Sequence, residues 1–178
     1  MGILKTLART WLISSVMMLF GCETVEMVFY EHLPSENFYR DLDVKDPALQ
    51  PFYVDDILLV VNTKYAPGNQ YFVWLGLFSE KENKRVDVLK ATISGNGLLK
   101  ESVLLAVIDI DNPTERSGLL QNAFGTFKLF TLDADWLEQV SDGGNPVKLT
   151  VAYRANDQEG VVEFELMRRV ERYPVFPT

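Results

Sequence analysis

Apolar residues recur along most of the chain in short runs, and turn-forming residues separate these runs. Residues 147–154 alternate clearly, and one side of the segment holds Val147, Leu149, Val151 and Tyr153. Because successive side chains of a strand point to opposite faces, this period of two predicts a strand with one buried face. Residues 161–167 repeat the pattern after a turn at 156–160, which predicts a hairpin with one face in water.

Six further segments have the composition of strands. They are residues 23–30, 52–63, 71–78, 86–94, 103–110 and 124–132. The runs 57–61 and 103–110 are apolar on both faces, which predicts strands that are buried on both sides. The apolar pattern of residues 86–94 changes phase around Leu89, as a β-bulge would allow. Turn residues at 66–70 and 95–97 separate neighbouring strands.

Residues 133–140 carry the signals of one short helix. Asp133 is a suitable N-cap, and Gly143 would end the helix. The apolar face of the helix would hold Trp136, Leu137 and Val140. Seven or eight strands, at turn spacings of about 8 to 12 residues, are typical of an antiparallel sandwich or barrel. We therefore expect a mainly β domain over residues 52–178, and an immunoglobulin-like sandwich is the first choice.

Residues 31–51 show no sustained period and contain three prolines among acidic residues. This composition predicts a loop or tether, so residues 22–51 would form an N-terminal tether with at most one edge strand. His32 is the only histidine of the chain and lies in this segment. We expect it to be a surface residue, because a catalytic imidazole must be held close to its nucleophile and oriented by a third group.

The first 21 residues have the layout of a secretory signal. Lys5 and Arg9 are their only charged residues, and an uncharged, mostly apolar stretch from 11 to 20 leads to Gly21 and Cys22. The apolar stretch is too short to cross a membrane, which requires about 20 residues. The sequence therefore predicts an exported protein.

The residues Leu19-Phe20-Gly21-Cys22 resemble the lipobox of bacterial lipoproteins, although Phe20 departs from the small or aliphatic residue that is usual there. The resemblance implies cleavage after Gly21, diacylglycerol on the sulfur of Cys22, and a third acyl chain on the new amino group. Two or three acyl chains anchor a protein durably, whereas one chain binds only marginally. The alternatives are an ordinary signal peptide that is cut nearby, or an uncleaved short anchor.

In lipoproteins of enteric type, aspartate after the cysteine often retains the protein in the inner membrane. Glu23 occupies that position. The resemblance thus implies anchoring in the outer membrane, with the domain in the periplasm. The inner membrane and the cell surface are the alternatives.

The charge and the cysteine count exclude several classes of protein. Removal of the first 21 residues lowers the formal net charge from −8 to −10. Such an acidic domain repels phosphate backbones and anionic head groups, which argues against nucleic-acid binding and electrostatic membrane adhesion. A single cysteine excludes an internal disulfide, a Cys-rich zinc site and a CxxC pair. The chain also lacks glycine-rich phosphate-binding motifs, so we expect no cofactor.

Acidic residues near predicted strand ends are the candidate metal ligands. They are Asp109, Asp111, Asp133 and Asp135, whose hard oxygen ligands would suit calcium. They lack the EF-hand spacing, and helix capping is the stronger role for Asp133. The aromatic set at 71–78 is expected to fill the core, and the tail at 173–177 either caps the domain or docks elsewhere.

These observations predict an envelope lipoprotein that is not an enzyme and that binds or scaffolds another envelope component. One alternative is an inhibitor or immunity lipoprotein, whose acidic surface would steer it to a basic toxin or enzyme. The other is a carboxylate- or calcium-dependent hydrolase of the envelope, because the 25 acidic residues leave many pairs that could perform acid–base work.

Overall fold

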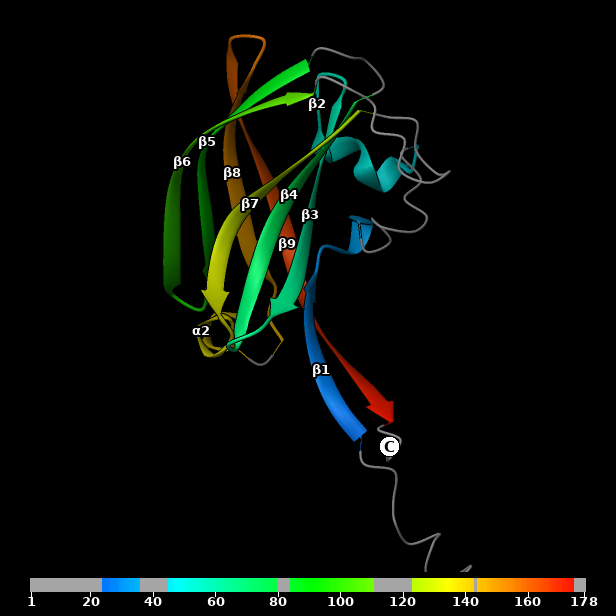
Figure 1. Ribbon diagram of the computed structural model, residues 1–178, viewed down its shortest axis with the longest axis vertical. Helices are drawn as coiled ribbons and strands as arrows, with labels where there is room; N and C mark the ends of the chain where they lie inside the picture. Colours follow the sequence, from blue (N-terminus) through cyan, green and yellow to red (C-terminus); the bar gives the residue numbers. More distant parts are fainter. Residues whose placement is uncertain (1–23, 36–44, 80–83, 111–122, 143, 175–178) are drawn as a thin grey trace, which may run out of the picture. The chain divides into compact units, whose positions relative to one another are not determined.

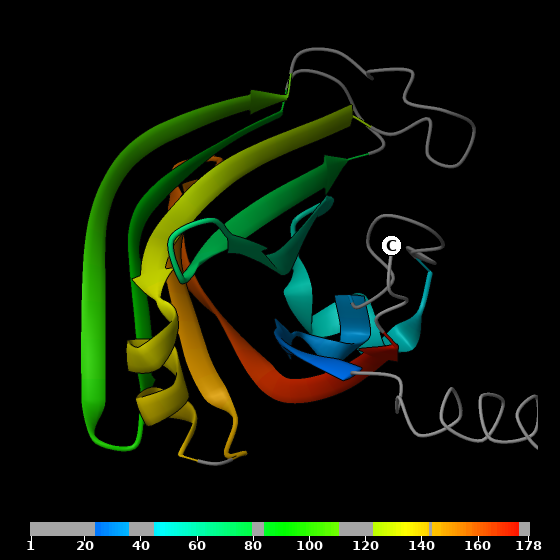
Figure 2. The same cartoon turned by 60° about the horizontal axis from the view of Figure 1, so that its bottom comes forward.

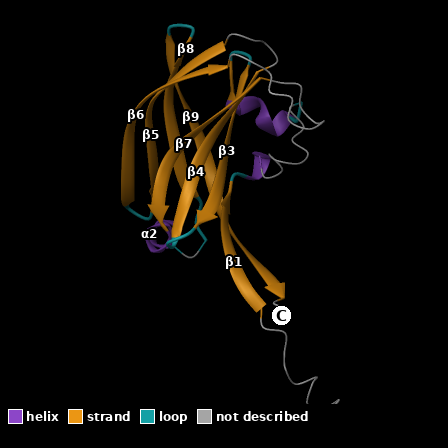
Figure 3. Ribbon diagram, in the orientation of Figure 1, coloured by secondary structure: helices purple, strands orange, loops and turns teal. Residues whose placement is uncertain are grey.

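The computed structural model describes residues 24–35, 45–79, 84–110, 123–142 and 144–174 of the 178-residue chain. Within these residues the chain forms nine strands in two antiparallel sheets, one α-helix and two short 3-10 helices (Figures 1 and 3). The prediction of a mainly β protein with one short helix is confirmed. No helix in this part of the chain has the length and hydrophobicity needed to cross a membrane.

The first sheet has five strands in the order β1-β9-β8-β5-β6. Its strands are β1 (Thr24–Glu31), β5 (Lys84–Gly95), β6 (Leu98–Ile110), β8 (Val147–Ala155) and β9 (Gln158–Pro174). The second sheet has the order β2-β3-β4-β7, with β2 (Tyr53–Val54), β3 (Ile57–Ala66), β4 (Gln70–Ser79) and β7 (Ala123–Asp133). The helices are η1 (Leu33–Ser35), η2 (Pro47–Phe52) and α2 (Ala134–Ser141).

The chain divides into two compact units, which are described separately below. Residues Phe29–Arg169 form the main unit, which contains most of both sheets. The smaller unit combines the two ends of the chain. Its described part consists of residues 24–28 of β1 and residues 170–174 of β9, and this pair of segments is called the arm.

Figure 2 shows the strands of the main unit curving around a common interior. The two sheets bury apolar side chains on their inner faces. Val147, Leu149 and Val151 of β8 are fully buried, as the alternation predicts. The rings of Tyr30 in β1 and Tyr71 in β4 meet edge-on with centroids 5.3 Å apart, so they join the two sheets. The core therefore lies between the inner faces of the sheets.

The predicted turns and the predicted bulge are confirmed. The β5–β6 turn consists of Asn96 and Gly97, both with positive φ (45° and 73°), and the β8–β9 turn consists of Asn156 and Asp157 (49° and 61°). Two consecutive left-handed residues match the twist of a β-hairpin. The ladders that β5 forms with β6 and β8 both shift register just before Lys90, which explains the change of phase in the apolar pattern.

The segment predicted as a tether is packed at its described ends. Helix η2 begins after Asp46, whose side chain accepts a hydrogen bond from the Ala48 backbone N–H at 2.8 Å. Its residue Leu49 is fully buried against Leu58 and Val60 of β3, in a cluster that Phe78 of β4 completes. This cluster explains why the run 57–61 is apolar on both faces, since η2 covers one face of β3.

The prediction of a central strand at residues 103–110, buried on both sides, is wrong about the position of this strand in its sheet. Strand β6 lies at the end of its sheet and pairs only with β5 among the described strands. The side chain of Val103 is 77% exposed, and Leu99 is also exposed. The side chains of residues 104–110 lie outside the described part. A run of apolar residues favours a strand, but it does not distinguish a central strand from an edge strand.

Candidate functional site

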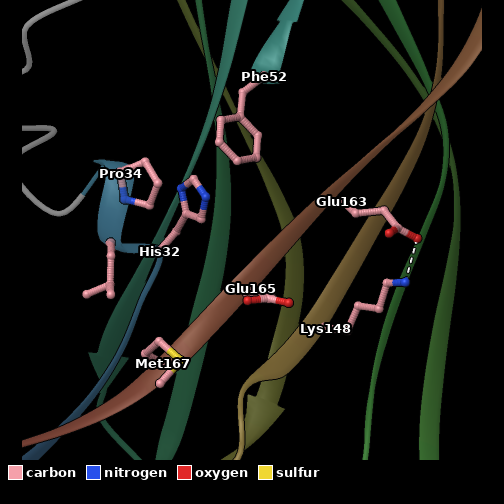
Figure 4. Close-up of a pocket in the computed structure, with 8 residues that line it drawn as sticks. His32, Pro34, Phe52, Lys148, Glu163, Glu165 and Met167 are labelled. Carbon is pink, nitrogen blue, oxygen red and sulfur yellow. Dashed lines mark ion pairs between the residues drawn. The ribbon is translucent and has the colours of Figure 1, made fainter. Parts of the chain in front are cut away.

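A hollow of about 430 Å³ opens beside strands β8 and β9 of the main unit (Figure 4). Its lining residues are His32, Leu33, Pro34, Phe52, Lys148, Glu163, Glu165 and Met167. Three of them follow β1 directly, one ends η2, and the others lie on the outer face of β8 and β9. The hollow therefore joins segments that are more than 100 residues apart in the sequence.

An aromatic cluster forms one wall of the hollow. The His32 ring meets Phe52 edge-on with centroids 4.5 Å apart, and it meets the buried Phe164 of β9 in the same way at 5.2 Å. Phe52 and Phe164 stack with their planes 12° apart. His32 is only 3% exposed, so the expectation of a surface histidine is wrong. The physical reason is that η2 and β9 each contribute a phenyl ring to its surroundings.

Burial also changes the chemistry of His32. Loss of hydration disfavours the imidazolium form and lowers the pKa of His32 to about 4. The ring is therefore neutral at pH 7, and it contributes an aromatic surface and a hydrogen-bonding edge instead of a positive charge.

Charged side chains form the opposite wall (Figure 4). Because strand residues two apart share a face, β9 presents Glu163, Glu165 and Met167 together. Lys148 of β8 lies opposite Glu165 in the register, and its Nζ pairs diagonally with the Glu163 carboxylate at 2.7 Å. Within the described residues Glu165 forms no ion pair, although Lys148 lies opposite it in the register.

The lining residues suit binding better than nucleophilic catalysis. None of the eight is a serine, threonine or cysteine. The apolar wall can bury an aliphatic or aromatic group, and Glu165 can accept hydrogen bonds from a cation or a hydroxyl. Glu163 and Glu165 lie about 7 Å apart along β9, estimated from the strand rise of about 3.3 Å per residue.

Three of the sequence-predicted residues cannot be placed as site residues. Cys22 and Asp111 lie outside the described residues. Asp109 lies in β6 opposite Arg85 in the β5–β6 register, but its side chain is outside the described part. The predictions for these residues therefore stay predictions.

The other two calcium candidates have structural roles at the start of α2. One carboxylate oxygen of Asp133 accepts the backbone N–H groups of Asp135 and Trp136, at 2.9 and 3.3 Å. The predicted N-cap is thereby confirmed. The Asp135 carboxylate accepts a hydrogen bond from the Asn69 side chain at 3.2 Å. The described residues contain no group of three or more His, Cys, Asp or Glu side chains that could hold a metal ion.

Phe72, Trp74 and Phe78 share one face of β4, and Tyr71 lies on the other. Tyr71 and Phe78 are buried, which confirms that they belong to the core. Phe72 and Trp74 are partly exposed, and the Lys128 ammonium lies 4.7 Å from the centre of the Phe72 ring. Burial, together with the nearby phenol groups of Tyr30 and Tyr65, raises the pKa of Tyr71 to about 12.

Sequence reasoning missed the hollow. The alternation of β9 does predict that Glu163 and Glu165 share a wet face. No sequence signal predicts that residues 32–34 and 52 lie beside this face, because their position depends on how Leu49 and Phe52 pack. The prediction for the tail is also incomplete, since β9 continues to Pro174 while residues 175–178 lie outside the described part.

Comparisons with known proteins show no family. No protein-family model and no curated protein matches the chain. A solved crystal structure of a protein from Archaeoglobus fulgidus is distantly similar. It is 13% identical, with a TM-score of 0.31, over 67% of this chain and 97% of the other.

Proposed function

We propose that this chain is an envelope lipoprotein, anchored in the outer membrane by acyl chains on Cys22, whose β domain lies in the periplasm. There the domain binds another envelope component without catalysing a reaction. The anchor concentrates the domain near membrane partners, which favours a binding or scaffolding role.

Two features support the anchored part of this proposal. The leader ends in Leu19-Phe20-Gly21-Cys22 and resembles a lipobox. The first strand begins at Thr24, so only Glu23 separates it from the cysteine. Cleavage before Cys22 would leave β1 whole, because every residue of β1 follows the cysteine.

The hollow beside β8 and β9 is the observation that supports the proposed binding role. It combines an apolar wall with a carboxylate, Glu165, that forms no ion pair within the described residues. Binding sites commonly pair apolar walls with a few placed polar groups. We therefore propose that the partner inserts an apolar side chain with a cationic or hydroxyl group into the hollow.

A pull-down from detergent-solubilised envelopes tests this role. We expect the wild-type protein to recover a reproducible partner and Glu165→Lys to lose it, because the new charge would repel a cationic group and fill the hollow. Glu159→Lys is the matched control, since Glu159 lies on the same strand outside the hollow and is exposed. Absence of a reproducible partner, or equal recovery by both variants, would contradict the proposal.

A second candidate function is hydrolysis of an envelope polysaccharide. The observation in its favour is that two carboxylates, Glu163 and Glu165, line one concave site. An acid and a base or nucleophile about 5 to 10 Å apart are the minimum for glycoside hydrolysis. Release of reducing sugars by the purified protein, abolished by Glu165→Gln, would favour the hydrolase over the binding module.

The immunoglobulin-like arrangement also stays a proposal. Two antiparallel sheets, of five and four strands, support a sandwich, and sandwich domains often serve as binding modules. An experimental structure in which the sheets pack face to face at about −30° would support this arrangement, and a different packing angle would contradict it.

A further inference from the structure

We propose that one face of the arm rests on the lipid surface, with Val25, Met27 and Tyr173 inserted among the head groups. The inference rests on the proposed lipid anchor at Cys22. It assigns to the arm a second, non-covalent attachment to the membrane.

The ion pair of the arm shows which side chains share a face. Segments 24–28 and 170–174 belong to neighbouring strands of one sheet (Figures 1 and 3). Arg172 donates to the Glu26 carboxylate, with its Nε at 2.8 Å from one carboxylate oxygen, so these two side chains lie on the same face. Adjacent residues of a strand point the opposite way. Val25, Met27 and Tyr173 therefore share the other face.

These three side chains are exposed although they are apolar or amphipathic. Val25 is 50% exposed, Met27 39% and Tyr173 43%. A two-stranded ribbon is at best marginally stable in water unless one face packs on something. The face of Glu26 and Arg172 also holds Val170, which is 40% exposed. Three of the four exposed apolar or amphipathic side chains nevertheless lie on the other face, together with Glu171, and a cover there would shield them from water.

The position of the anchor identifies the lipid surface as that cover. Two residue steps separate Cys22 from Thr24, and they span at most about 7 Å at about 3.5 Å per residue. Interfacial segments bury their apolar groups at a depth of about 5 to 10 Å in the membrane surface. Acyl chains on Cys22 would hold the start of β1 within that depth. Tyrosine is enriched at this level, because its ring is apolar and its hydroxyl reaches water.

The charges of the arm favour hydrophobic contact over electrostatic attraction. Glu171 shares a face with Tyr173, by the same alternation, and accepts a hydrogen bond from its hydroxyl. Arg172 is paired with Glu26 on the other face. We therefore expect the contact to depend little on anionic lipid.

Fluorescence quenching in vesicles tests the inference. The mature protein, purified with its native modification, is placed in phosphatidylethanolamine and phosphatidylglycerol vesicles with brominated acyl chains. Tyr173→Trp supplies the reporter, and the signal of the wild-type tryptophans is subtracted. We expect the reporter to be quenched at least about twofold more than Val103→Trp, a control at an exposed apolar position of the main unit.

A second reporter, Met27→Trp, should be quenched to a similar degree. It shows whether the quenching is a property of the whole face or only of the substitution at Tyr173. The intact mass of each sample is measured in parallel. Acylated protein whose arm reporters are quenched no more than Val103→Trp overturns this inference alone. A mass without acyl groups overturns the proposed function, and this inference with it.

Discussion

The imidazole of His32 meets the phenyl ring of Phe52 edge-on, with ring centroids 4.5 Å apart and ring planes at 83°. His32 follows β1, and Phe52 is the last residue of η2. This contact joins the predicted tether to Phe52, which the sequence places at the start of a strand over residues 52–63 and which ends η2 in the structure. It also places the only histidine of the chain in the wall of the hollow.

The titration of His32 is the first prediction. Because the ring is buried, its pKa is lowered to about 4, against 6.5 for a hydrated histidine. An NMR titration of the ring protons should therefore show one histidine signal with a midpoint near pH 4. A midpoint near 6.5 would show that the ring is hydrated and that the wall of the hollow is open.

The same shift makes stability depend on pH. Between pH 6.5 and 4 the unfolded chain binds the His32 proton while the folded protein does not, so stability is lost as the pH falls through this window. The loss levels off below pH 4 and approaches about 3.5 kcal/mol, at about 1.4 kcal/mol per pKa unit. Urea unfolding of wild type and of His32→Phe at pH 7.5 and 4.5 measures it. Equal losses in both proteins would contradict the prediction.

Leu49 should be a main determinant of how η2 is held on the sheet. Leu49→Ala removes a fully buried side chain from the cluster with Leu58, Val60 and Phe78, at an expected cost of about 2 to 5 kcal/mol. Leu99→Ala changes an exposed leucine and should alter stability by less than about 0.5 kcal/mol. Similar unfolding midpoints in urea for the two variants would mean that η2 does not pack as described.

Gly95 allows a close approach between β5 and α2. A Cβ atom at this position would lie 2.6 Å from the Val140 carbonyl oxygen, which is backbone and cannot swing away. We expect Gly95→Ala to destabilise the protein by about 1 to 3 kcal/mol. In Gly160→Ala the new Cβ meets the phenol end of Tyr153, a movable side chain, so the cost should be below about 1 kcal/mol. Thermal unfolding of both variants should show this order, and the reverse order would contradict the close approach.

Asp133 should act as a helix cap and not as a calcium ligand. Asp133→Ala removes the acceptor of two backbone N–H groups and should cost about 1 kcal/mol. Asp133→Ser should recover most of this loss, because serine is also a good N-cap. If calcium raised the unfolding temperature of wild type but not of Asp133→Ala, the metal-ligand role would replace the capping role.

Most of the regular structure could be predicted from local patterns. The alternation at 147–154, the turn at Asn96 and Gly97, the phase change near Lys90 and the Asp133 cap each depend on neighbours in the sequence. Such signals reflect backbone conformation and side-chain period, which local sequence determines.

The placement of elements could not be predicted in the same way. Val103 lies in an apolar run yet is exposed, in a strand at the end of its sheet. His32 and Leu49 lie in a proline-rich segment without a period, yet both are buried by partners outside that segment. The apolar wall of the candidate site depends on these contacts, so the sequence did not predict it. The carboxylates of the site could be predicted, because the alternation of β9 places them on a face in water.

The mass of the native protein tests the central claim most directly. Protein extracted from its own envelope should begin at Cys22 and carry two or three acyl chains, and Cys22→Ser should carry none and should keep its leader. A native chain that retains residues 1–21, or that has no acyl mass, would contradict the envelope lipoprotein.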